Sequence, residues 1–137
     1  MNANETASDL VRSYLAAMEA RDLPRAESML APGFSMQFPG AVTFTKLAEL
    51  IAWAQPRYRF VKKHYERFDE APGIGESIVY CYGTLAGVWP DGAAFGGIRF
   101  IDRFAVAGGK LVQQTVWNDL AEVQRRDAAP AGSTSVR

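Results

Sequence analysis

The chain has 137 residues, and its 15 Lys and Arg balance its 15 Asp and Glu, so the formal net charge is zero at pH 7. This length suits one domain with a single core, and the charge balance argues against nucleic acid or an acidic membrane as a partner. The single cysteine excludes an internal disulfide, and with only one histidine besides it the composition argues against a metal site. We therefore expect no metal and no other cofactor.

The sequence predicts neither a secretion signal nor a membrane span. The first residues lack a basic start and an apolar stretch, and no apolar run approaches the roughly 20 residues that cross a bilayer. We expect a cytoplasmic protein that does not bind membranes. Residues 1–6 are expected to be flexible, residues 7–124 to form one domain, and the small, polar residues 125–137 to form a disordered tail.

Helical periodicity dominates the first part of the chain. Apolar residues recur at helical spacing over residues 7–21, a short second helix starts near Pro24, and a third helix covers residues 45–54. A short strand is expected at residues 34–38. Four longer strands follow, separated by turns that contain Gly or Pro: residues 58–68, 77–89, 95–106 and 111–117. Helices followed by a meander of strands predict an α+β fold.

One of these strands carries a carboxylate on an apolar face. Side chains alternate along a strand, so Asp102 shares a face with Phe100 and Phe104, while Arg99 and Arg103 point the other way. Burial penalises a charged carboxylate, so Asp102 must either meet hydrogen-bond donors or stay protonated with a raised pKa. Perturbed acids concentrate at functional sites. The alternative is a structural acid bonded to nearby groups, and the spacing alone does not decide between the two.

Three helices followed by a curved antiparallel sheet resemble the nuclear transport factor two (NTF2)-like superfamily, in particular its SnoaL-like branch. Residues 12–18 resemble the first helix of ketosteroid isomerase, with Tyr14 at the place of its oxyanion tyrosine. Residues 101–104 resemble the strand that bears its protonated aspartic acid, with Asp102 in that place. The resemblance implies a cone-shaped α+β fold in which three N-terminal helices pack on a curved antiparallel sheet around an internal pocket. It also implies that Tyr14 and a protonated Asp102 donate hydrogen bonds to an enolate oxygen.

The position of the isomerase's catalytic base falls on Phe38, which cannot accept a proton. His64 is the only side chain with an unperturbed pKa near neutrality, so it is the default proton carrier if one exists. Its polar surroundings favour an exposed position. A neighbouring basic stretch favours a solvated strand face over an anion site: Arg57, Arg59, Lys62 and Lys63.

The sequence leaves open which face of the last strand lines the pocket. A two- or four-residue turn before this strand would pair Asp102 with Thr115 and bring Gln113 and Trp117 inward. A three-residue turn would instead bring inward Gln114, Val116 and Asn118.

Both faces of residues 77–89 are apolar. Tyr80 and Tyr82 lie on one face, and Val79 and Cys81 lie on the other. One face would line the cone and the other would meet a partner sheet, so we expect a homodimer.

We expect a small apolar molecule with a carbonyl group or ring as the ligand. Tyr14 and Asp102 would act as oxyanion donors in isomerisation or other enolate chemistry, with His64 as the candidate proton carrier. The alternative, favoured by the missing base, is a non-catalytic binding protein or a structural homodimer. The further candidates for contact with the ligand are Phe38, Trp53, Tyr58, Tyr82, Phe100, Phe104, Trp117 and Asn118.

Overall fold

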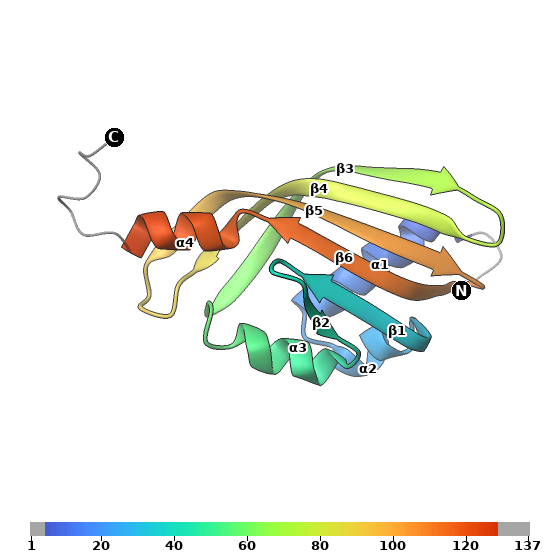
Figure 1. The fold of residues 1–137 in the computed structure, drawn as a ribbon, viewed down its shortest axis with the longest axis horizontal. Helices are drawn as coiled ribbons and strands as arrows, with labels where there is room; N and C mark the ends of the chain where they lie inside the picture. The colour runs from blue at the N-terminus through green and yellow to red at the C-terminus, as the bar shows by residue number, and fades with distance from the viewer. Residues whose placement is uncertain (1–4, 129–137) are drawn as a thin grey trace.

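The structure, a computed structural model, describes residues 5–128. Its helices pack against one curved sheet, which confirms the predicted α+β class, and α1 lies against one face of the long strands (Figure 1). In chain order the elements are α1 (Ala7–Glu19), α2 (Leu23–Glu27), β1 (Leu30–Phe38), β2 (Val42–Phe44), α3 (Leu47–Ala54), β3 (Phe60–Pro72), β4 (Ser77–Val88), β5 (Ala94–Ala107), β6 (Lys110–Asn118) and α4 (Leu120–Ala128).

The six strands form one sheet in the order β2-β1-β6-β5-β4-β3. Strands β3 to β6 pair as the expected antiparallel meander, and β2 pairs antiparallel with β1. Strands β1 and β6 are parallel, which corrects the expected wholly antiparallel sheet at one pair. Most of the domain separates these two strands in sequence, so no hairpin constrains their relative direction. The sheet is therefore mixed.

Helix α1 begins where a capping box satisfies its first backbone donors. Thr6 Oγ1 accepts a hydrogen bond from the backbone N–H of Asp9 at 3.0 Å, and the Asp9 carboxylate accepts one from the backbone N–H of Thr6 at 3.1 Å. Thr6 is thus a helix cap, although it falls in the segment expected to be flexible. The buried stripe of the helix contains Leu10, Val11, Tyr14, Leu15 and Met18. This arrangement holds Tyr14 in the middle of the face that packs on the sheet.

Strand β3 approaches β4 very closely at Gly83. A Cβ atom on Gly83 would lie 1.9 Å from the carbonyl oxygen of His64, so any larger residue would force the two strands apart. The pairing also shifts by one residue between Tyr65 and Arg67, which leaves Glu66 as a bulge. A bulge bends its strand and increases the local twist. Lys63 and Tyr65, which lie just before the bulge, line the concave side of the sheet.

The C-terminal helix α4 extends into the residues expected to form a disordered tail. The side-chain oxygen of Asn118 accepts a hydrogen bond from the backbone N–H of Leu120 at 3.0 Å, at the start of the helix. Near its end, Asp127 accepts a bond from the indole N–H of Trp89 at 3.0 Å. Helix α4 thus corrects the predicted tail for residues 125–128, and the predictions for residues 1–4 and 129–137 lie outside the described residues. Within residues 5–128, no helix has the length and apolar character needed to cross a membrane.

Candidate functional site

A cavity of about 120 Å³ lies between α1, α3 and the concave face of the sheet. An engineered protein cavity of about 150 Å³ holds benzene, so this one has room for about one six-membered ring. Its wall is mainly apolar, and the two helices supply Leu15, Met18, Leu50, Ile51 and Ala54. An apolar wall that also carries polar groups is typical of a small-molecule site. The lining residues with polar groups are Tyr14, Glu19, Arg21, Tyr58, Lys63, Tyr65 and Gln114.

The hydroxyl of Tyr14 is a buried donor on this wall. The side chain is 1% exposed, and its hydroxyl has no hydrogen-bond partner in the described part of the chain. The ring is fixed by edge-on contact with Phe104, with 6.0 Å between the ring centroids. Burial, together with the nearby charge of Asp102, raises the pKa of the Tyr14 hydroxyl above its ordinary value. At neutral pH the group therefore keeps its proton and can donate it in a hydrogen bond.

Asp102 is fully buried on the apolar face of β5, as the alternation of side chains predicted. Its Oδ2 lies 2.5 Å from Nζ of Lys63 on β3. The sequence left open whether Asp102 meets a hydrogen-bond donor or stays protonated. In the structure it meets a donor, the ammonium group of Lys63. In this contact the carboxylate accepts and the ammonium donates, so Asp102 is the counterion of Lys63 where the resemblance implied a protonated donor. Its second oxygen, Oδ1, has no partner among residues 5–128.

Lys63 brings a positive charge to the cavity wall. Burial acts to lower the pKa of Lys63, but the Asp102 carboxylate outweighs this effect and leaves the pKa above its ordinary value. The ammonium group has three N–H donors, and its hydrogen bond to Asp102 uses one of them. The expected solvated strand face therefore does not include Lys63. The alternation of side chains along β3 indicates that Lys63 points toward the cavity, because Lys63 shares a face with Val61 and Tyr65.

Gln114 reaches the cavity because β6 contains a bulge. Gly108 and Gly109 form a two-residue turn, but the pairing shifts after Leu111 and leaves Val112 as an extra residue. Asp102 consequently pairs with Val116, the register expected of a three-residue turn. Gln114 is 4% exposed and lines the cavity, and its Oε1 has no partner within the described chain.

Five of the predicted ligand contacts lie at or close to the cavity. Phe38 and Tyr58 line it directly. Phe104 lies behind Tyr14, and the ring of Phe100 lies beneath the Lys63 ammonium, with 4.8 Å between Nζ and the ring centroid. One layer further out, Trp53 packs on Phe38 with 5.5 Å between their ring centroids.

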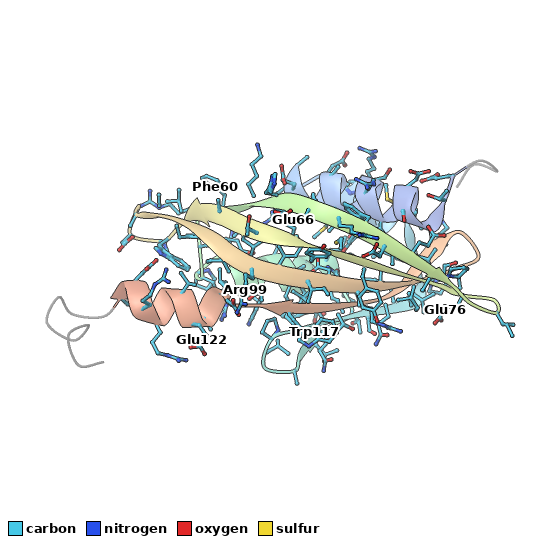
Figure 2. The ribbon with its side chains drawn as sticks, turned by 90° about the horizontal axis from the view of Figure 1, so that it is seen from above. Phe60, Glu66, Glu76, Arg99, Trp117 and Glu122 are labelled. Atoms are coloured by element: carbon cyan, nitrogen blue, oxygen red, sulfur yellow. The ribbon has the colours of Figure 1, made fainter. Side chains whose placement is uncertain are left out.

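Four predicted site residues lie away from the cavity. His64 is exposed on the opposite face of β3 from Lys63, and Tyr82 is 40% exposed on the outer face of the sheet. Trp117, labelled on β6 in Figure 2, is 49% exposed, because the bulge turns it outward. Asn118 is engaged at the start of α4.

The wall combines two kinds of hydrogen-bonding group. Tyr14 and Lys63 are donors, and the oxygen of Gln114 is an acceptor. Glu19, near the end of α1, is the only carboxylate among the residues that line the cavity, and Phe38 occupies the expected base position. Within residues 5–128, no three His, Cys, Asp or Glu side chains lie close enough together to hold a metal ion.

Comparisons with known proteins identify the fold. No protein-family model matches the sequence, and no curated protein is significantly similar to it. An NTF2-like protein of unknown function from Burkholderia pseudomallei superimposes with a TM-score of 0.72 at 21% identity, over 89% of this chain and 97% of that chain. TerC, co-crystallised with polyporic acid, gives a TM-score of 0.70 at 14% identity, over 86% of this chain and 95% of that chain. The fold of this chain is therefore that of the NTF2-like proteins.

The SnoaL-like branch is represented among these structures. A protein from Jannaschia described as a SnoaL-like polyketide cyclase gives a TM-score of 0.64 at 15% identity, over 94% of this chain and 99% of that chain. This likeness is one of fold, and it agrees with the α+β fold that the resemblance implied.

Proposed function

We propose that the cavity binds a small, mainly apolar molecule that contains a ring and an oxygen able to accept hydrogen bonds. The observation that carries this proposal is the Tyr14 hydroxyl, a buried donor on the cavity wall with no protein partner among residues 5–128. A buried donor is costly to leave unpaired, so a ligand that accepts its hydrogen bond gains affinity. The size of the cavity limits the enclosed part of the ligand to about one ring.

Lys63 supplies a second donor. This residue lines the same cavity as Tyr14, and the Asp102 carboxylate stabilises the charge of its ammonium group. Two donors from different elements, α1 and β3, would fix the orientation of a bound oxygen. TerC, which has a similar fold, was co-crystallised with polyporic acid, and this supports an organic ligand for a chain of this fold.

The same donors favour enolate chemistry in a bound ketone as a second candidate function. Tyr14 and Lys63 would stabilise negative charge that develops on the ketone oxygen, an effect worth about 3–4 kcal/mol per donor in other enzymes. Among residues 5–128, Glu19 is the only carboxylate that lines the cavity, and it is therefore the candidate proton acceptor. Exchange of the α-protons of cyclohexanone in D₂O tests this function, because catalysis should fall in Glu19→Gln and remain in Glu27→Gln, which changes a carboxylate outside the cavity. Equal exchange with and without the protein would exclude it.

The test of binding is a ¹⁹F NMR titration with 4-fluorophenol, a probe of the size that the cavity allows. Tyr14→Phe should weaken binding by about tenfold, the effect of one hydrogen bond. Tyr80→Phe is the matched control, because it removes the same hydroxyl from the outer face of the sheet. Equal affinity in wild type and Tyr14→Phe, or no binding to folded wild type, would refute the proposal.

We also propose that a second copy of the chain covers the outer face of the sheet. Tyr82 pairs with Ile101, which pairs with Trp117, so three large side chains form a row across β4, β5 and β6. Their exposed fractions are 40%, 37% and 49%. Contiguous exposed apolar groups of this kind are typical of protein interfaces.

A further inference from the structure

Gln114 lies between buried apolar residues of the sheet. Its register partners on the two neighbouring strands are Met36 on β1 and Phe104 on β5, and both are 0% exposed. Gln114 itself is 4% exposed, and Asp102 is the only other buried polar or charged residue among residues 5–128. Lys63 pairs with one carboxylate oxygen of Asp102, whereas the only side-chain oxygen of Gln114 has no partner among residues 5–128.

Packing alone does not explain a glutamine at this position. Methionine has a side chain of similar length and shape and would avoid the cost of burying an unpaired acceptor. Buried polar atoms without a partner are rare, and each needs an explanation, such as a functional role or a bound water or ion. For Gln114 we look for this explanation in the cavity, because Gln114 is one of its lining residues.

The oxygen of Gln114 complements the donors of Tyr14 and Lys63 on the wall. A ketone or an ether accepts hydrogen bonds from Tyr14 and Lys63 but offers nothing to the Gln114 oxygen. A hydroxyl group has a proton to donate as well as lone pairs that accept. We infer that the ligand of this cavity carries a hydroxyl group that donates to Oε1 of Gln114, so that phenols, enols or ring alcohols are bound in preference to simple ketones and ethers. This inference rests on the proposed binding function and narrows its ligand class.

The test compares two probes, of which only one has this donor. 4-Fluorophenol has a hydroxyl proton, and 4-fluoroanisole carries a methyl group in its place. Wild type should bind the phenol about tenfold more tightly in ¹⁹F NMR titrations, and Gln114→Met should reduce this preference to about twofold or less. Gln113→Met is the matched control, because Gln113 is exposed on the opposite face of β6, and it should leave the preference unchanged.

The outcomes separate this inference from the function on which it rests. If Gln114→Met keeps the full preference for the phenol while Tyr14→Phe weakens binding, the inference is wrong and the proposed function stands. If 4-fluorophenol does not bind folded wild type, both are wrong. Gln114→Met should unfold at a urea concentration at least as high as wild type does, since it removes a buried unpaired oxygen. Gln114→Leu serves as a second variant with the same expected loss of preference.

Discussion

The ammonium nitrogen of Lys63 and Oδ2 of Asp102 lie 2.5 Å apart and connect β3 to β5 across the intervening strand β4. The Asp102 side chain is completely buried and that of Lys63 is 21% exposed. Neither charge is fully solvated, so each depends on the other. The pair therefore contributes both to the charge of the cavity wall and to the stability of the fold.

Removal of one partner of this pair should destabilise the protein strongly. Lys63→Met leaves the Asp102 carboxylate buried without its ammonium, and such changes cost about 3–5 kcal/mol. The double variant Lys63→Met/Asp102→Leu removes both charges. Its free energy of unfolding should lie within about 1 kcal/mol of the wild-type value, because apolar replacement of a whole buried pair is often neutral. Urea denaturation of the two variants and wild type measures the difference. Equal stability of the single and the double variant would show that the pair is not coupled in this way.

The protein should lose stability at alkaline pH. Burial raises the pKa of the Tyr65 hydroxyl from 10.0 to about 12 and that of the Cys81 thiol from 9.0 to about 12. Above pH 9 the unfolded chain therefore releases protons that the folded chain retains, so the free energy of unfolding falls as the pH rises toward 12. Each group contributes a slope of up to about 1.4 kcal/mol per pH unit.

Urea denaturation at a series of pH values tests this prediction, and Cys81→Ala assigns the first part of the decrease. Without the thiol the decrease should begin near the ordinary pKa of tyrosine, one pH unit higher, since 10.0 − 9.0 = 1. An unchanged pH profile in Cys81→Ala would contradict the assignment, and constant stability up to pH 11 would contradict the prediction as a whole.

Gly83→Ala should be one of the most damaging small substitutions in the sheet. Its Cβ would lie 1.9 Å from the carbonyl oxygen of His64, and a backbone atom cannot move aside as a flexible side chain can. We expect a loss of at least about 2 kcal/mol in thermal or urea unfolding. Gly96→Ala is the matched control, because its Cβ would meet only the Cβ of Ala86, at 3.9 Å. A similar stability of the two variants would contradict the close approach of β3 and β4.

The proposed dimer should dissociate when a charge is placed at the centre of the apolar row. Ile101 lies between Tyr82 and Trp117 on the outer face. In Ile101→Glu the partner subunit would bury the new carboxylate at this position, at a cost of several kcal/mol. Sedimentation velocity should then show a monomer where wild type sediments as a dimer. Ile74→Glu makes the same change at a fully exposed position and should remain dimeric. A monomeric wild type at concentrations of about 100 μM would contradict the proposal.

Local patterns in the sequence were sufficient to find two residues of the candidate site. Tyr14 follows from helical spacing and Asp102 from strand alternation, and each depends only on neighbours within its own element. The partner of Asp102 is 39 residues away in sequence, so the pairing with Lys63 is a property of the assembled sheet. Nothing in the local pattern of either strand indicates this contact.

The inward position of Gln114 was undecided for a different reason. The register of β6 depends on the bulge at Val112, and turn length alone does not reveal a bulge. Two elements escaped prediction altogether. Strand β2 has only three residues, and α4 is stabilised by contacts with distant parts of the chain, such as the bond between Asp127 and Trp89.

The position of β3 at the edge of the sheet links the cavity to local opening of the chain. An edge strand pairs on one side only and separates from its sheet more readily than a central strand does. Each time β3 opens around Lys63, the deeply buried Asp102 loses the ammonium that balances its charge. The ion pair therefore opposes the local opening of β3. A ligand bound to Lys63 would slow the amide hydrogen exchange of the whole strand, although most residues of β3 would not contact the ligand.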